Sequence, residues 1–385
     1  MSGFGRAMRR EFGLADGIDH LNHGGYGATP RRVLAAAEEW RARMEADPPG
    51  FFRRELPLRL REAAGRVAGF LGGAPEDWAF VENATAGTNA ILRSLDLEPG
   101  DEVLCLSQVY GAVANALGHH AGRRGARVRS IPVPVPFRDP ERLLAALRAA
   151  LGPKTRLAAL DHITSAGGVV LPIAEMTAIC RAADVPVAVD GAHAPGQIAL
   201  DVPALGVDWY VGNLHKWAFA AKGTAVLWCA PEQQRELHPV AISHYLGQGF
   251  AAEFDYCGTR DNSAWLAAPA ALDFLAAAGP QGLRERNRAL ATSAGRMLAE
   301  AWHSEMAAAP EFCAAMASLR LPGAWPQTAA ARQAAYRILD EHHIRAGVML
   351  LDGGLWIRVS AQIYNEIEDY RRLAELGPLF AGGGD

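Results

Sequence analysis

Two short runs of the sequence place an acid and an amine where they could act together. The run Val189–Gly196, Val-Asp-Gly-Ala-His-Ala-Pro-Gly, carries Asp190, and Gly212–Trp217, Gly-Asn-Leu-His-Lys-Trp, carries Lys216 26 positions later. A lysine amine forms a Schiff base with an aldehyde, and a carboxylate keeps a ring nitrogen protonated. An enzyme needs both groups to hold pyridoxal phosphate (PLP), so the pair predicts amino-acid chemistry.

Lysine is rare in this chain, which makes Lys216 conspicuous. Of the 38 lysine and arginine residues only three are lysines, Lys154, Lys216 and Lys222. Lys216 lies in the mostly apolar run Asn-Leu-His-Lys-Trp-Ala-Phe, an unusual setting for a charge that only confers solubility. Lys222 is the alternative Schiff-base lysine, but no histidine adjoins it. The sequence therefore favours Lys216.

The turn Glu82–Gly87, Glu-Asn-Ala-Thr-Ala-Gly, is a second candidate binding feature, because it follows an expected strand and opens an expected helix. Small residues let the backbone approach an anion, and free N–H groups at a helix start attract phosphate. An ordinary helix cap by Asn83 or Thr85 would also explain the turn. Taken alone, the turn leaves both interpretations open.

Length, composition and charge limit the class of protein and the kinds of partner that are expected. The chain has 385 residues, of which 50% are hydrophobic, enough for a large core and more than one domain. A net charge of −4 predicts no nucleic-acid partner, and no apolar run of about 18 residues predicts a membrane span. The five cysteines lie far apart without the spacing of metal ligands. We therefore expect a cytoplasmic protein with reduced thiols, no metal and no membrane contact.

The elements that must position these residues alternate between strand and helix. Short apolar runs and helical stretches from about residue 70 to 227 predict a mainly parallel sheet covered on both faces. Seven strands are expected at residues 78–81, 102–106, 127–132, 157–161, 185–189, 209–211 and 224–228, and helices at 86–95, 111–121, 140–151 and 173–183. Ligands gather at the carboxyl ends of such strands, where Asp190 and the Glu82–Gly87 turn lie.

The alternation stops after Arg260. Expected helices at residues 264–278, 281–302 and 327–342, with a strand at 355–359, indicate a smaller C-terminal α/β domain. We expect an N-terminal segment at residues 1–20, a large cofactor-binding domain at 21–258 and the smaller domain at 259–385.

With these features in place, the chain resembles PLP-dependent enzymes of the class V aminotransferase fold (fold type I), which include cysteine desulfurases. Within them it is most similar to the isopenicillin N epimerase-like branch. The matching motifs are, in chain order, residues 21–27, 82–87, 190–196, 215–216, 257–261 and 356–365. The resemblance implies PLP as cofactor, an amino acid as substrate, and a homodimer with shared active sites.

The resemblance also assigns roles to single residues. Lys216 would form the Schiff base, Asp190 would bind the ring nitrogen, and His193 would lie near the phenolic oxygen. The other implied cofactor contacts are Ala84, Thr85, Ala86, Tyr110, Asn213, His215 and, from the neighbouring subunit, Thr259. The implied substrate contacts are Asn22, His23, Tyr26 and Arg358. Arg358 would grip the α-carboxylate, a role suited to a planar fork of donors.

One of these residues, Tyr110, and one neighbour, His162, keep a second interpretation, and a third residue, His193, departs from the pattern of desulfurases. Tyr110 would stack on the cofactor or, alternatively, pack at the start of a helix. His162 is at least as consistent with a buried core histidine as with a catalytic group. His193 stands where desulfurases usually carry glutamine.

The reaction that follows removal of the α-proton stays open. Epimerisation is expected first, narrowly ahead of a β-eliminating carbon–sulfur lyase, with transamination third. A PLP-binding module without activity would have no use for Arg358. An epimerase needs a second acid, for which Tyr26, His23 and Tyr110 are candidates. Desulfurases carry a catalytic cysteine shortly before the carboxylate-binding arginine, whereas this chain has no cysteine between Cys313 and Arg358, which argues against persulfide formation.

Overall fold

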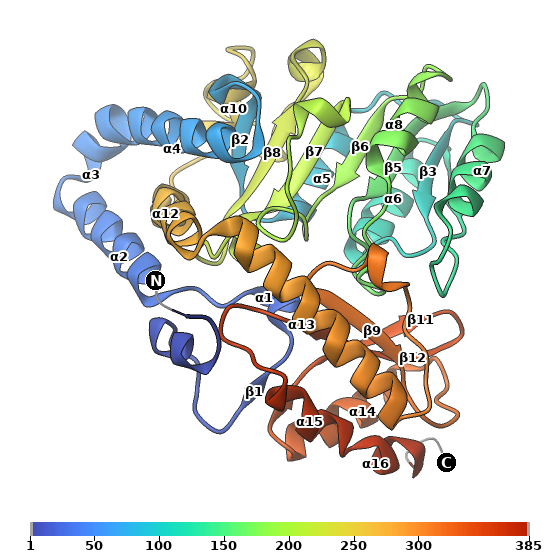
Figure 1. Ribbon diagram of the computed structural model, residues 1–385. Helices are drawn as coiled ribbons and strands as arrows, with labels where there is room; N and C mark the ends of the chain where they lie inside the picture. Colours follow the sequence, from blue (N-terminus) through green and yellow to red (C-terminus); the bar gives the residue numbers. More distant parts are fainter. Residues whose placement is uncertain (1–2, 383–385) are drawn as a thin grey trace.

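The computed structural model describes residues 3–382, which form a large domain around one sheet and a smaller domain beside it (Figure 1). The large sheet has seven strands in the order β2–β8–β7–β6–β5–β3–β4. These are β2 (Trp78–Val81), β3 (Glu102–Leu106), β4 (Arg127–Ile131), β5 (Thr155–Asp161), β6 (Val187–Asp190), β7 (Trp209–Asn213) and β8 (Ala225–Cys229). Strand β8 runs antiparallel to both of its neighbours, and the other pairings are parallel. The predicted fold class is confirmed.

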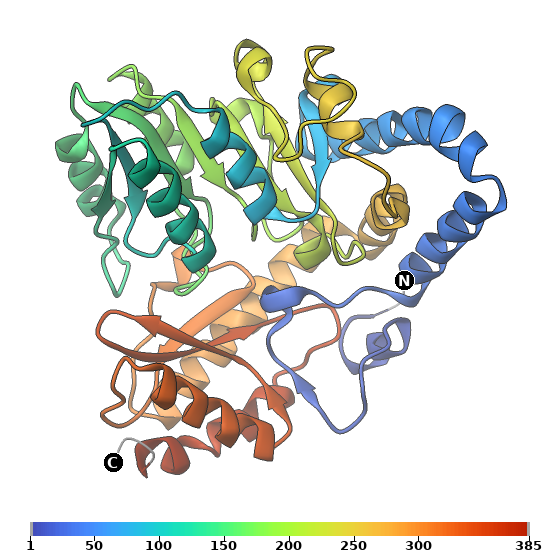
Figure 2. The same ribbon diagram turned by 180° about the vertical axis from the view of Figure 1, so that it is seen from behind.

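The central strands are apolar on both sides because helices cover both faces of the sheet. Alternate residues of β3 face different cores, with Leu104 and Leu106 in one and Val103 and Cys105 in the other. Helices α5 (Ala84–Ser94) and α6 (Gly111–Arg123) cover one face, seen in front in Figure 2. The opposite face is covered by α4 (Leu56–Leu71), α7 (Pro140–Ala150), α8 (Ile173–Arg181) and α12 (Ala268–Ala278).

Segments next to both predicted domain boundaries pack against the neighbouring domain. Strand β1 (Asp19–His20) pairs in parallel with β10 (Ile344–Arg345), so the N-terminal segment lies with the smaller domain. The helices α11 (Ser263–Leu266) and α12 pack against α2 (Arg31–Ala46) and α4, in the large domain. The remaining short elements are η1 (Arg6–Glu11), α3 (Pro48–Gly50), η2 (Phe51–Glu55), η3 (Pro75–Asp77), η4 (Pro203–Leu205), η5 (Pro231–Glu236), α10 (Phe250–Asp255) and η6 (Pro310–Phe312).

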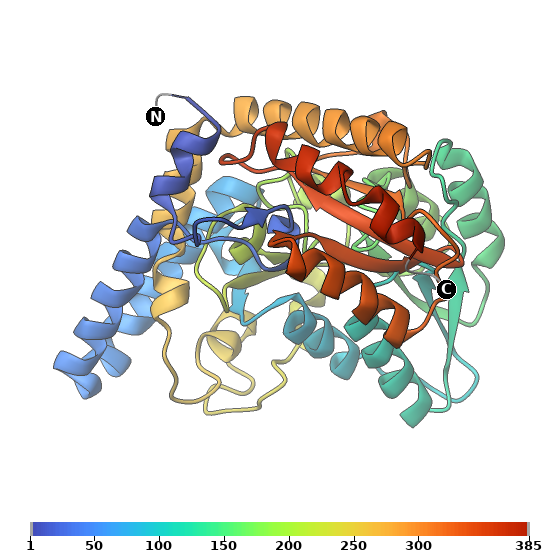
Figure 3. The same ribbon diagram turned by 90° about the horizontal axis from the view of Figure 1, so that it is seen from below.

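The smaller domain is built on a three-stranded antiparallel sheet in the order β11–β12–β9. Its strands are β9 (Met316–Arg320), β11 (Gly347–Leu351) and β12 (Gly354–Ser360), and its helices are α13 (Pro280–Ala301), α14 (Ala329–Glu341), α15 (Glu368–Ala374) and α16 (Gly377–Gly382). Helix α13 runs along one side of it (Figure 3). The sequence predicted β12 and α14 but missed β9, β11, α15 and α16. Across residues 3–382, no helix combines the length and apolar character that crossing a membrane requires.

Candidate active site

The carboxyl ends of three neighbouring strands open into one cavity of about 380 Å³. Asp161, Asp190 and Asn213 are the last residues of β5, β6 and β7, and all three line it. Strand β7 leads directly into the short helix α9 (Leu214–Trp217), which brings Lys216 to the same edge. The cavity is also lined by Gly25, Tyr26, Asn83, Ala84, Thr85, Tyr110, Ile163, Ser165, Ala192, His193 and His215. The structure thus gathers most of the residues that the resemblance assigned to the site.

The N-terminal loop reaches this site because the short helix α1 (His23–Tyr26) packs on α9. Gly27, at φ 72°, allows the close contact, since a Cβ there would lie 1.9 Å from the His215 carbonyl oxygen. The contact leaves Tyr26 at the mouth of the cavity with 77% of its surface exposed.

His23 was predicted to contact the substrate, but it lies behind Lys216 and does not line the cavity. It is buried, with Nε2 2.9 Å from the Lys216 carbonyl oxygen and Nδ1 2.9 Å from the Tyr364 hydroxyl. A carbonyl only accepts, so Nε2 carries the proton and Nδ1 accepts from Tyr364. Burial lowers the pKa of His23 to about 3, so the ring stays neutral. We therefore correct the predicted role: His23 supports the Lys216 backbone.

The surroundings of the Lys216 side chain favour its neutral amine form. Its Nζ lies 3.1 Å from Nε2 of His193, whose Nδ1 lies 3.3 Å from the indole nitrogen of Trp217. Because an indole N–H can only donate, Nδ1 is an acceptor and the proton of neutral His193 resides on Nε2. His193 then donates to the lysine nitrogen. Burial and the nearby Arg358 charge lower the pKa of Lys216 to about 8, and burial also lowers the pKa of His193.

The start of α5 offers a small anion site at the cavity wall. Asn83 is its N-cap and accepts from the Ala86 N–H at 2.9 Å, while Asn213 accepts from the Ala84 N–H at 2.8 Å. The backbone amides of Ala84 and Ala86 were predicted to contact the phosphate, but both donate to asparagine side chains instead. Within residues 3–382 this leaves the N–H and hydroxyl of Thr85, at the positive end of the helix, to meet a phosphate. Asn83 is thus both an ordinary cap and part of the site.

Of three further predicted cofactor contacts, two line this cavity and one lies outside it. His215 lines it and donates from Nδ1 to the Thr224 carbonyl oxygen at 3.0 Å. Thr259 is exposed, bonds the Tyr256 hydroxyl at 3.2 Å and lies outside the cavity of its own chain. Tyr110 lines the cavity as the N-cap residue of α6 and is half-exposed.

Arg358 is held in the middle of the fully buried strand β12. One terminal nitrogen donates to the Ser165 carbonyl oxygen at 2.5 Å, and the other to Oδ1 of Asn22 at 2.9 Å. Its Nε has no hydrogen-bond partner within the described part of the chain, and Ser165 lines the cavity. Asn22, predicted to touch substrate, instead orients this guanidinium. Arg358 itself is 2% exposed and is not among the residues that line the cavity, so its grip on a substrate carboxylate stays a prediction.

These groups fit PLP. The cavity offers an amine for its aldehyde, a helix start for its phosphate and an aromatic side chain, Tyr110, beside them. Among residues 3–382 only one oxygen of Asp190 is engaged, by the Ala192 N–H at 2.9 Å, which leaves the other for the ring nitrogen. When bound, PLP supplies an electron sink for negative charge at the substrate α-carbon.

Sequence reasoning missed three residues of the site, namely Asp161, Ser165 and Trp217. Asp161 could have been found, because it ends an expected strand next to that of Asp190. Ser165 bonds Arg358 through its backbone, and Trp217 acts through the orientation of its ring. Neither of these contacts has a signal in the sequence.

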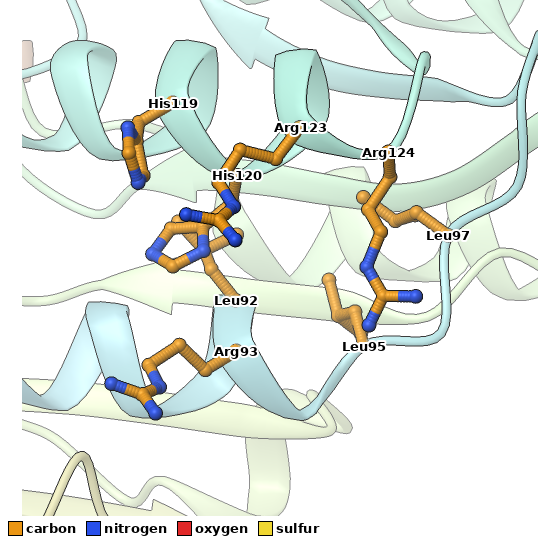
Figure 4. A pocket seen from close by; sticks show the side chains of 8 residues that line it. All are labelled: Leu92, Arg93, Leu95, Leu97, His119, His120, Arg123 and Arg124. Carbon is orange, nitrogen blue, oxygen red and sulfur yellow. The ribbon is translucent and has the colours of Figure 1, made fainter.

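A second cavity, of about 360 Å³, lies at the C-terminal ends of α5 and α6, the opposite end of α5 from Thr85 (Figure 4). Its basic lining residues are Arg93, His119, His120, Arg123 and Arg124. Basic side chains are stabilised there by the negative ends of the helix dipoles. The basic cavity is therefore explained without a ligand.

Comparison with known proteins identifies the family. The model of the aminotransferase class-V family matches residues 25–373. The chain belongs to this family. It is 33% identical to a putative L-cysteine desulfhydrase of Oryza sativa subsp. japonica, over 95% of this chain and 84% of that protein. It is 34% identical to isopenicillin N epimerase of Streptomyces clavuligerus, over 93% of this chain and 94% of that protein.

Solved structures agree with this assignment. A C-DES variant with glycine covalently linked to its PLP cofactor superimposes with a TM-score of 0.81 at 25% identity, covering 97% of this chain and 99% of the other. The predicted family, fold and cofactor are therefore confirmed, and the protein is a PLP-dependent class V enzyme. Its relatives include both epimerases and carbon–sulfur lyases, so the family alone does not define the reaction.

Proposed function

We propose that this class V enzyme is a lyase that removes a β-substituent, such as a sulfur group, from a small amino acid. The buried amine of Lys216 carries the proposal, because the two candidates in the cavity for the second acid of an epimerase, Tyr26 and Tyr110, are both exposed. The cavity of about 380 Å³ must hold both PLP and substrate, which favours a compact amino acid. Elimination needs one base beside the α-carbon, and Lys216 supplies it.

Each residue of the site has a defined task in this reaction. Arg358 binds the α-carboxylate of the substrate, and Lys216 removes the α-proton with its neutral amine. His193 keeps its Nε2 proton toward the reacting end of the site, because Trp217 occupies Nδ1. Asp190 keeps the ring nitrogen of PLP protonated. With cysteine, addition of water completes the balance, giving pyruvate, ammonia and hydrogen sulfide.

The cysteines of the chain support release of sulfur as a small molecule. All five lie within the described residues, and none of them lines the cavity. Four are buried, and burial raises the pKa of Cys313 to about 11. A thiolate that could accept sulfur is therefore missing from the cavity. The rice desulfhydrase cited above carries a name of the same reaction class.

Epimerisation, which the sequence favoured, is the second candidate. It requires an acid on the face opposite Lys216, and two of the three candidates, Tyr26 and Tyr110, line the cavity. The third, His23, lies outside it. The tyrosines and the 34% identical epimerase support this alternative, whereas the exposure of both tyrosines to solvent places it after the lyase.

Product analysis separates the two reactions. The holoenzyme would be incubated in deuterium oxide with L-cysteine, L-cystine and enantiopure amino acids without a leaving group, with Lys216→Ala as the inactive control. The lyase predicts sulfide or persulfide in solution together with a keto acid, and no inverted amino acid. An inverted, α-deuterated amino acid without keto acid, resolved by chiral chromatography, would replace the lyase by the epimerase.

We also propose a homodimer in which Thr259 reaches the cofactor of the partner subunit. Thr259 is exposed and lies outside its own cavity. The segment before α10 exposes apolar side chains beside a groove of about 670 Å³ between α4 and α10, namely Val240, Ile242, Tyr245 and Leu246. An exposed apolar cluster of this kind is typical of an interface. A cytoplasmic location stays an expectation from the sequence.

A further inference from the structure

Two carboxyl groups lie side by side at the base of the active site. Asp161 and Asp190 are register partners at the ends of the parallel strands β5 and β6. Neighbouring strands are about 4.8 Å apart, and in-register side chains of parallel strands point to the same face. Both residues accordingly line the same cavity. Only Asp190 has an assigned task, so the role of Asp161 needs an explanation.

The surroundings of Asp161 do not suit an ionised carboxylate. The residue is 3% exposed, and its Oδ2 has no hydrogen-bond partner among residues 3–382. Burial and the adjacent Asp190 charge both raise the pKa of Asp161 well above its usual value. An unpartnered oxygen in a buried carboxyl group indicates that a proton, or a ligand that donates one, completes the arrangement.

The titratable and charged groups around the pair come from several elements. They are Lys216 on α9, Tyr210 on β7, His162 after β5, Cys105 on β3 and the backbone N–H of Tyr110 before α6. Lys216, when protonated, is the cationic member of this group, and its charge acts on Asp190. His162 is neutral, because burial lowers its pKa to about 4, and its Nδ1 bonds the Tyr210 hydroxyl at 2.9 Å. A cation that could balance a second negative charge on Asp161 is not among these neighbours.

We propose that Asp161 is a positioning residue that stays protonated and donates a hydrogen bond to the Asp190 carboxylate, so that the two side chains work as one singly charged pair. Asp161 then orients Asp190 toward the ring nitrogen of PLP without adding a second charge. Like charges so close rarely ionise together in a buried site. The inference rests on the assignment of Asp190 to the ring nitrogen, and it holds for either reaction considered above.

Two substitutions distinguish a neutral donor from a charge. Asp161→Asn keeps a neutral side chain that can donate to Asp190, whereas Asp161→Leu has a similar size and no donor. We expect Asp161→Asn to keep the PLP dissociation constant within a few-fold of wild type. Asp161→Leu should raise it about 10- to 100-fold, the effect of one hydrogen bond to a charged group. Equal losses in both variants would show that the charge of Asp161 is needed, and would overturn the proposal.

A measurement on the apo-protein is independent of the cofactor and of turnover. A protonated carboxyl group has a carbonyl stretch that a carboxylate lacks. The infrared difference spectrum between wild type and Asp161→Asn should contain this band at neutral pH. Asp101→Asn serves as the control, because Asp101 is buried but paired with Arg156 at 3.1 Å. A wild-type spectrum without the band would refute a protonated Asp161, even if Asp161→Leu fails to fold.

The pH dependence of apo-protein stability supplies a third readout. A raised pKa means that folding at neutral pH must keep a proton on Asp161 that the unfolded chain has lost. Wild type therefore loses stability relative to Asp161→Asn as the pH rises above the usual pKa of aspartate. We expect the thermal midpoint of Asp161→Asn to exceed that of wild type at pH 7, with the difference vanishing near pH 4. A difference that is constant with pH would contradict the proposal.

Discussion

Replacing Arg358 by lysine tests how the substrate carboxylate is held. The guanidinium has five N–H groups, of which one bonds the Ser165 carbonyl and one bonds Asn22, so that three remain, enough for a bidentate carboxylate. A lysine ammonium has three N–H groups. If two of them replace the contacts to Ser165 and Asn22, only one is left for the substrate. The variant therefore loses one charge-assisted hydrogen bond, about 1.5 to 3 kcal/mol, or a 10- to 150-fold rise in dissociation constant.

The assay is a titration of the holoenzyme with glycine and with methylamine, followed by the visible absorbance of PLP. Methylamine lacks the carboxylate, so it should bind wild type and Arg358→Lys about equally, whereas glycine should bind the variant 10- to 150-fold more weakly. The spectrum without ligand should stay unchanged. Equal losses for both ligands, or a PLP spectrum that collapses, would show that Arg358 supports the fold rather than the carboxylate, and would refute the reasoning.

The remaining predictions concern Lys216 and its partners. Only the neutral amine of Lys216 captures PLP, and its lowered pKa is about 8. The rate at which the apo-protein captures PLP should therefore rise with pH around a midpoint near 8. A midpoint above 10, as for an ordinary lysine, would contradict this. Trp217→Phe removes the indole N–H, so the proton of His193 can move to Nδ1 and Nε2 can accept from protonated Lys216. The pH midpoint of PLP capture should then move upward, which stopped-flow mixing would measure. Borohydride should fix PLP to the peptide that contains Lys216, and label on Lys222 would reject the assignment. Thr259→Ala should weaken PLP retention about 10- to 100-fold while the dimer persists in sedimentation, and a fully active monomer would exclude the shared site.

The sequence alone was sufficient for the large sheet and for the main chemical groups. Short apolar runs buried on both faces identify parallel strands, and the carboxyl ends of those strands must meet at one edge, so the grouping of Asp190 with Glu82–Gly87 could be anticipated. The scarcity of lysine singled out Lys216. In the smaller domain β9 and β11 were missed although they are as long as β3 and β4, because the alternation of strand and helix that identified the large sheet stops before them.

What only the tertiary structure decided was the partner of each polar side chain. The sequence could propose His23 for the cavity, but the contact between α1 and α9 turns its ring to the Lys216 carbonyl. Likewise, the register of β5 against β6 puts Asp161 beside Asp190, and the orientation of the Trp217 ring fixes the proton of His193. A residue type and its spacing limit which chemistry is available. Hydrogen-bond direction and charge proximity depend on distances of a few ångströms between segments far apart in the chain, and these distances exist only in the folded protein.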